Sequence, residues 1–159
     1  MTAMDAATDL RSEINNLSAT LNKESDDLTE AITNFDRYLI DLRLGVIATA
    51  PISSSTWEDP RTGEAGSEET LLCFTKEEPY GWGLYIITEG DDGHDGQGGR
   101  KTGSMRRLRD APRDERVAAV KHFPALLETI KAIASKELND VRDARKQAEE
   151  FLAQLKITK

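Results

Sequence analysis

This chain of 159 residues has few of the residue types from which catalytic and metal sites are usually built. It contains one cysteine and two histidines. An intrachain disulfide framework is therefore excluded, and a zinc site made of cysteine and histidine alone is not expected. No nucleophile, base and orienting group occur together in a recognisable arrangement. We predict that the protein is not an enzyme and that it binds no cofactor and no metal.

Long apolar runs are also missing. No stretch approaches the roughly 18 apolar residues that a membrane span needs. The segment Met1–Asp5 has neither a basic start nor an apolar stretch, so no secretory signal is expected there. A single cysteine fits a reducing compartment. These features predict a cytoplasmic protein without a membrane partner.

What the sequence does contain is a matching heptad rhythm near each end. In both segments apolar residues recur at alternating spacings of four and three, which keeps them on one face of a helix and calls for an apolar partner. The first seam comprises Leu10, Ile14, Leu17, Leu21, Glu24, Leu28, Ala31, Phe35, Tyr38 and Leu42. The second comprises Leu127, Ile130, Ala134, Glu137, Val141, Ala144, Ala148, Phe151 and Leu155.

Between the seams the period changes. Three short runs rich in β-branched and aromatic residues predict strands, and Pro79-Tyr80-Gly81 is typical of a hairpin turn. We expect one α+β domain over residues 1–159, with a long antiparallel helical hairpin and a three-stranded antiparallel β-meander inserted between its helices. The predicted elements are a long helix over 2–43, the meander over 44–88, a flexible loop over 89–104, a short helix over 111–122 and a second long helix over 124–157.

The two seams can be aligned on each other. If Leu42 faces Phe123 in an antiparallel hairpin, Leu10 faces Leu155 and the apolar positions stay opposed along the whole length. The order of helix, strands and helix, with the helices closing on each other, resembles the plan of prefoldin subunits. That resemblance is one of topology only. It implies assembly through the strands and capture of unfolded clients by the helical tips.

The glycine-rich stretch 89–104 holds two superficial motifs. Asp91, Asp92, His94 and Asp95 suggest a cation loop, but their spacing differs from that of a calcium site. Residues 96–102 suggest a phosphate loop, but Arg100 separates Gly99 from Lys101. Six glycines in sixteen residues favour a mobile linker instead.

The segment 100–121 reverses the charge of the chain. It carries eight basic and three acidic groups, whereas the whole chain has a net charge of −8. Arginine can donate two hydrogen bonds to a phosphate or a carboxylate. A solvated helix face that neutralises the acidic segment 53–98 is the plainer interpretation. The candidate anion or partner contacts are Arg106, Arg107, Arg109, Arg113 and Arg116.

The remaining candidates are aromatic residues and a thiol. Trp57, Tyr80 and Trp82 lie in or beside predicted loops, where aromatics commonly anchor interfaces, although Trp82 could equally belong to the core. Cys73 lies within a predicted strand and is expected to be buried and inert. His94 and His122 have no acid or base partner in the sequence.

These observations favour a non-enzymatic interaction or assembly protein, possible chaperone-like behaviour included, whose partner is itself or another protein. The alternative hypothesis is an accessory protein that binds anions or nucleic acid through the arginine-rich segment 100–121. The sequence leaves the partner and the oligomeric state open.

Overall fold

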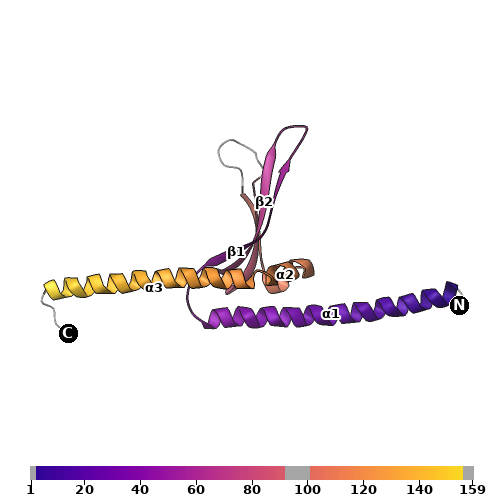
Figure 1. Ribbon diagram of the computed structural model, residues 1–159, viewed down its shortest axis with the longest axis horizontal. Coiled ribbons are helices and arrows are strands. Elements are labelled where there is room, and N and C mark those ends of the chain that lie inside the picture. Colours follow the sequence, from indigo (N-terminus) through magenta and orange to yellow (C-terminus); the bar gives the residue numbers. More distant parts are fainter. Residues whose placement is uncertain (1–2, 92–100, 156–159) are drawn as a thin grey trace.

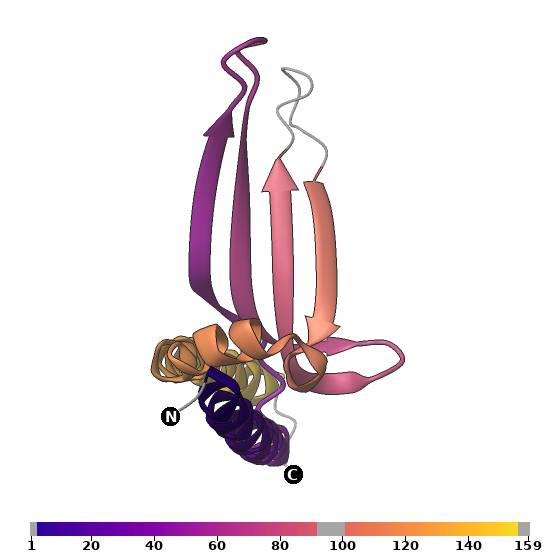
Figure 2. The same cartoon turned by 90° about the vertical axis from the view of Figure 1, so that its right-hand side faces the viewer.

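The computed structural model describes residues 3–91 and 101–155 and has the shape of a T (Figure 1). Two long helices, α1 (Ala3–Asp41) and α3 (Phe123–Gln154), form the crossbar. A four-stranded sheet stands on the middle of the crossbar, and its far end projects away from the helices (Figures 1 and 2). A short 3₁₀ helix η1 (Leu108–Asp110) and helix α2 (Arg113–Val120) connect the sheet to α3.

The sheet is an antiparallel meander in the order β1 (Ala48–Glu58), β2 (Ala65–Glu77), β3 (Gly81–Asp91) and β4 (Lys101–Arg107). The sequence predicted three strands, so this prediction is wrong by one strand. The fourth strand occupies part of the stretch that we expected to be a loop. Gly103 and Ser104 pair with Glu89 and Thr88. The backbone N–H and C=O groups that make a ladder are present in glycine as in any other residue except proline.

The other strands are longer than predicted for a related reason. β1 and β2 extend through the polar stretch that looked like a loop, and only a short turn at Asp59–Glu64 joins them. These outer halves are exposed on both faces, so they carry no apolar alternation that a sequence reading could detect. Cross-strand pairing forms them without a core beneath.

The core lies where the lower half of the sheet rests on the helices. Alternate residues of β2 and β3 point toward the helices, and Leu72, Phe74, Leu84 and Ile86 are buried there. They pack against apolar side chains from α1, η1, α2 and the first turns of α3. The buried side chains from these four helices are Ile32, Leu39, Leu108, Ala119, Leu126 and Ile130.

The structure contradicts the predicted helical hairpin. α1 and α3 run in the same direction, overlap only over a few turns, and leave the head at opposite ends (Figure 1). The ring of Phe35 stacks on the ring of Phe123, whereas the hairpin would have placed Leu42 there. α2 causes the difference, because it lies along α1 beside Asn22, Ser25 and Thr29 and delivers the chain to α3 already pointing the same way.

The two helices therefore end in projecting arms. Every residue from Thr8 to Glu24 of α1 is exposed, and so is every residue from Ser135 to Leu155. We call residues 8–24 the N arm and residues 135–155 the C arm. The likeness to prefoldin subunits ends with the order of elements, since the helices do not close on each other.

Candidate functional site

The arms carry rows of exposed apolar side chains. In the N arm, Leu10, Ile14, Leu17 and Leu21 lie on one face, and the side chain of Leu17 is 69% exposed. In the C arm, Val141 and Phe151 are 65% and 59% exposed. Large contiguous apolar stripes on a protein surface generally mark an interaction site. Sequence reasoning found these residues but assigned them to each other within one chain.

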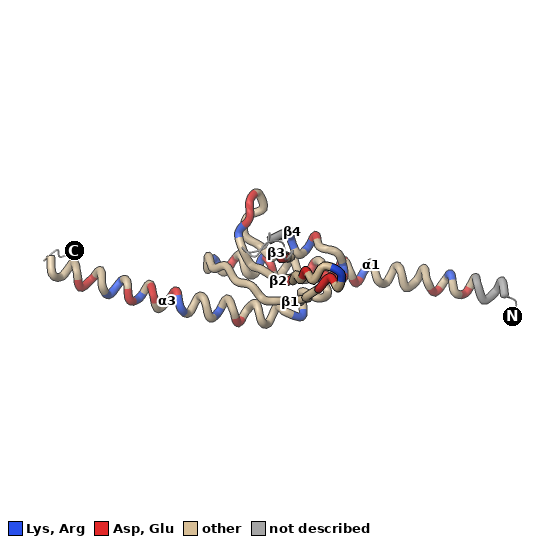
Figure 3. Tube along the Cα trace, turned by 90° about the horizontal axis from the view of Figure 1, so that it is seen from above, with Lys and Arg blue, Asp and Glu red and all other residues tan. Residues whose placement is uncertain are grey.

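The polar residues of the arms do not bias them toward a partner of one charge. Lysine, arginine, aspartate and glutamate are interspersed along the C arm, as Figure 3 shows. The C arm contains one internal ion pair, between Arg145 and Glu149 at 3.6 Å. Such an exposed pair contributes little to stability. Charge therefore does not distinguish one face of the arms from another, whereas the apolar seam does.

The predicted arginine patch is not a single surface. Arg106 and Arg107 are neighbours in β4, so their side chains point to opposite faces of the sheet. On the helix side, Nη2 of Arg106 lies 3.1 Å from Oε1 of Glu115. On the other side, Nη2 of Arg107 donates a 2.6 Å hydrogen bond to the carbonyl oxygen of Tyr80, and its guanidinium lies 5.5 Å from the centre of the Tyr80 ring.

Arg113 and Arg116 instead join α2 to α1. Nη1 of Arg116 donates a 3.1 Å hydrogen bond to the carbonyl oxygen of Ser25 and another to Oγ1 of Thr29, and its Nη2 donates a 2.9 Å bond to Oγ of Ser25. Arg113 donates one longer bond, of 3.3 Å, to Asn22. Arg109 lies 3.8 Å from its neighbour Asp110. All five arginines are thus engaged within the chain, and their role as partner contacts stays a prediction.

The three predicted interface aromatics have different surroundings. Tyr80 is 65% exposed in the turn between β2 and β3, beside Arg107. Trp82 is only partly exposed, and its ring packs on Phe74 at a centroid distance of 5.4 Å, which joins it to the core. Trp57 lies at the far end of the edge strand β1 and is 45% exposed. These three residues do not form one surface, and their role as interface anchors stays a prediction.

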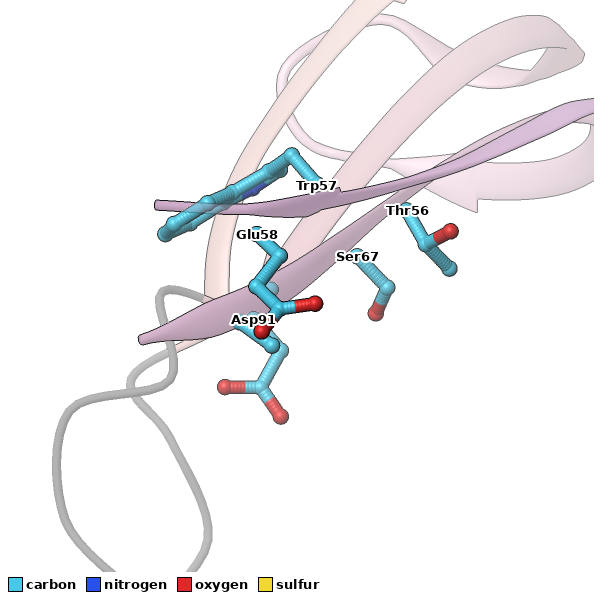
Figure 4. A pocket seen from close by; sticks show the side chains of 7 residues that line it. Thr56, Trp57, Glu58, Ser67 and Asp91 are labelled. Carbon is cyan, nitrogen blue, oxygen red and sulfur yellow. The ribbon is translucent and has the colours of Figure 1, made fainter. Parts of the chain in front are cut away.

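Trp57 borders the hollow shown in Figure 4. This hollow has a volume of about 480 Å³ and is lined by the ends of β1, β2 and β3. Glu58, Ser67 and Asp91 line it, while Trp57 packs over the backbone opposite, at Gly66. A Cβ at Gly66 would overlap the Trp57 ring, so glycine is what lets the indole lie flat there. The hollow is shallow, and its polar lining consists of hydroxyl and carboxylate side chains.

A second hollow, of about 370 Å³, lies between the sheet and α2. Its charged lining groups include Glu68, Asp114 and the ion pair of Arg106 with Glu115. The lining includes no histidine, cysteine or lysine. In the described part of the chain, no group of three or more histidine, cysteine, aspartate or glutamate residues could hold a metal ion. Asp92, His94, Asp95 and residues 96–100, which suggested cation and phosphate loops, lie outside the described residues.

One buried carboxyl group, that of Asp36, was not singled out from the sequence. Oδ1 of Asp36 in α1 accepts a 2.7 Å hydrogen bond from the backbone N–H of Leu84 in β3. Burial raises the pKa of Asp36, and the Leu84 hydrogen bond and the charges of Arg107 and Arg109 offset this only in part. Asp36 is not one of the heptad positions and belongs to no motif. Its role depends on Leu84, which is distant in the sequence, so only the tertiary structure identifies it. It serves to dock α1 on the sheet.

Cys73 is buried in β2, as the sequence predicted. Burial raises the pKa of the Cys73 thiol to about 11, and the charge of Glu77 adds to the effect. A thiol with such a pKa is almost entirely protonated at neutral pH and is a poor nucleophile. The residue is placed for packing.

The chain was also compared with known proteins. It matches no protein-family model, no curated protein and no solved structure. The described helices include none that is long and apolar enough to cross a membrane.

Proposed function

We propose that this protein is a non-enzymatic assembly protein whose two helical arms bind helical partners. The observation that carries the proposal is the pair of exposed heptad seams, which extend in opposite directions from one head (Figure 1). An isolated amphipathic helix of about 20 residues is marginally stable in water without a tertiary partner. Both seams have the spacing of a coiled coil, which satisfies that need by helix-on-helix packing.

The head has a separate role in this proposal. It holds the two arms at a fixed separation and direction, through the Phe35–Phe123 stack and the hydrogen bonds of Arg116 to α1. A rigid spacer between two binding helices suits a subunit of a larger assembly. The chaperone-like variant of this function depended on the hairpin likeness to prefoldin and is not carried forward. We place the protein in the cytoplasm, which the single buried Cys73 supports.

The experiment compares seam variants with matched variants on the far side of the same helices. Leu17→Asp and Phe151→Asp put a charge into each seam, whereas Ala19→Asp and Ala153→Asp put the same charge off the seam. We expect the wild type and the off-seam variants to form complexes larger than one chain in sedimentation or native mass measurements. The seam variants should lose these complexes because a charge buried at a helix interface is not tolerated.

Thermal unfolding of the head serves as the control for folding. The arms do not pack on the head, so its unfolding should shift by no more than about 0.5 kcal/mol in any of the four variants. If the wild type is monomeric at micromolar concentration and captures no partner in a seam-dependent manner, the proposal fails.

The alternative function, binding of anions or nucleic acid by segment 100–121, remains a prediction. Its described arginines already donate to groups within the chain, and no observation favours it. Binding of DNA or RNA that weakens steeply as salt rises would support it, because phosphate contacts release counterions.

A further inference from the structure

We infer that the partner of the arms is a second copy of this chain, and that two copies form a twofold dimer. In this dimer, the N arm of each copy packs antiparallel on the C arm of the other. The inference rests on the proposed function and names the occupant of its seams. It also differs from the hairpin that the structure contradicts, because the paired helices belong to different chains.

The direction of the two long helices favours this dimer. α1 and α3 run the same way along the crossbar, one arm at each end (Figure 1). A twofold axis perpendicular to the crossbar reverses that direction and exchanges the ends. It therefore places the N arm of one copy beside the C arm of the other, antiparallel, on both sides at once. This is a closed, self-complementary arrangement, the commonest form of oligomer.

The lengths of the two arms also favour this dimer. The N arm, residues 8–24, has 17 residues, and the C arm, residues 135–155, has 21. At 1.5 Å per residue they extend about 26 and 32 Å. Arms of such similar length cover most of each other.

The sizes of the facing seam side chains suit the antiparallel pairing. With Leu10 opposite Leu155 of the other copy, Ile14 meets Phe151, Leu17 meets Ala148 and Leu21 meets Ala144. Two large side chains thus face two small ones in the middle layers, which suits close packing. A parallel pairing of two C arms would instead place Ala144 and Ala148 opposite themselves beside a Phe151 pair. That pairing would leave a gap in the middle of the interface.

The twofold axis of this dimer lies beside exposed apolar side chains. Phe35 and Phe123 share one level along the crossbar, so the antiparallel register places the twofold axis near Tyr38 in α1 and near Leu127 in α3. Tyr38 is 54% exposed and Leu127 is 38% exposed. Apolar side chains therefore lie exposed at the axis as well as along both arms.

The area is sufficient for a stable dimer. Nine large, exposed apolar side chains on the two arms of each copy would bury on the order of 1,000 Å² in the dimer from these side chains alone, near the roughly 1,200 Å² at which stable specific interfaces begin. Alanines, the aliphatic stems of lysine and arginine, and the side chains at the axis add to this. The large side chains are Leu10, Ile14, Leu17, Leu21, Leu138, Val141, Phe151, Leu152 and Leu155.

Disulfide crosslinking of the full chain tests the pairing. Leu17 and Ala148 lie about 64 Å apart along the crossbar of one copy, but they face each other between copies. The double variant Leu17→Cys/Ala148→Cys should be converted by mild oxidation mainly to covalent dimer. A mixture of the two single variants should give the same product, and Cys73 is buried and present in all samples.

Control variants distinguish this dimer from the other ways in which the two seams could be covered. Ala19→Cys/Lys146→Cys lies at the same level on the opposite faces and should give no dimer beyond background. Efficient dimer formation by Leu17→Cys alone would indicate parallel N arms and would overturn the inference. An oxidised monomer of the double variant would indicate arms closing within one chain, with the same consequence.

A monomeric wild type in sedimentation would also overturn the dimer. If that monomer still bound a different protein through its seams, the proposed function would stand and only the identity of the partner would change. If it bound nothing, both would fail.

Discussion

The rings of Phe35 in α1 and Phe123 at the start of α3 are stacked, with their centroids 4.3 Å apart. This contact joins the two long helices where they overlap and holds them in the same direction. It places residue 35, and not residue 42, at the level where α3 begins. The two arms consequently point away from each other, and their seams remain available.

The separation of the arms within one chain is the first prediction. Dyes at Ala19→Cys and Lys146→Cys should lie about 60 Å apart along the crossbar. We expect low energy transfer between them when the labelled chain is diluted into an excess of unlabelled chain. The dilution removes transfer between two labelled copies. High transfer under dilution would mean that the helices close on each other within one chain, contrary to the structure.

The second prediction concerns the attachment of α2 to α1. Arg116→Ala removes three hydrogen bonds and leaves Oγ of the buried Ser25 without the guanidinium donor. We expect a loss of about 1–3 kcal/mol in the free energy of unfolding, measured by urea denaturation. Arg113→Ala is the matched control, since its one long bond to Asn22 is exposed, and it should cost less than about 0.5 kcal/mol. Equal effects of the two substitutions would contradict this assignment.

The third prediction uses the raised pKa of Asp36. The folded state holds the proton of this carboxyl more tightly than the unfolded state, whose pKa is near the model value of 3.8. The resulting stability is fully present below that value and is lost as the pH rises through the folded pKa. The difference in unfolding free energy between Asp36→Asn and the wild type should therefore grow in favour of the variant over that interval and then level off.

A second substitution at the same site separates charge from hydrogen bonding. Asp36→Asn keeps an oxygen that can accept from the N–H of Leu84, whereas Asp36→Ala leaves that buried donor unpaired. We expect Asp36→Ala to lose about 1–3 kcal/mol relative to Asp36→Asn at neutral pH. Urea titrations of the three proteins across acidic and neutral pH provide the measurement. A wild-type stability that rises with pH relative to Asp36→Asn would contradict the prediction.

The fourth prediction concerns the reactivity of Cys73. Since burial raises the pKa of this thiol to about 11, the native protein should react with a thiol reagent at pH 8 far more slowly than an exposed thiol does. Ala19→Cys supplies the exposed thiol for comparison. In urea, both thiols should react at similar rates. Rapid reaction of Cys73 in the native state would show that this part of the sheet opens readily.

Much of the secondary structure could be predicted from the sequence because it depends on local patterns. The heptad spacing predicted both long helices, and Pro79-Tyr80-Gly81 predicted the turn between β2 and β3. The fourth strand and the outer halves of β1 and β2 could not be predicted. Their residues are mostly polar and show no regular apolar alternation, and pairing with neighbouring strands makes them strands.

The functional candidates divide in the same way. The seam residues were found because periodicity marks them. The engagement of Arg106, Arg107, Arg113 and Arg116 within the chain, and the docking role of Asp36, could not be found, because each depends on a residue far away in the sequence. A run of arginines looks the same in the sequence whether it faces solvent or a neighbouring helix.

The sequence by itself determined that each end of this chain is a helix with an apolar face. Only the tertiary structure decided where those faces point. The physical reason is that heptad spacing shows only that a helix face needs to be buried. The direction of each helix depends on the path of the chain that connects the two helices. Here α2, attached to α1 by Arg116, returns the chain parallel to its start and leaves both faces without a partner in the chain.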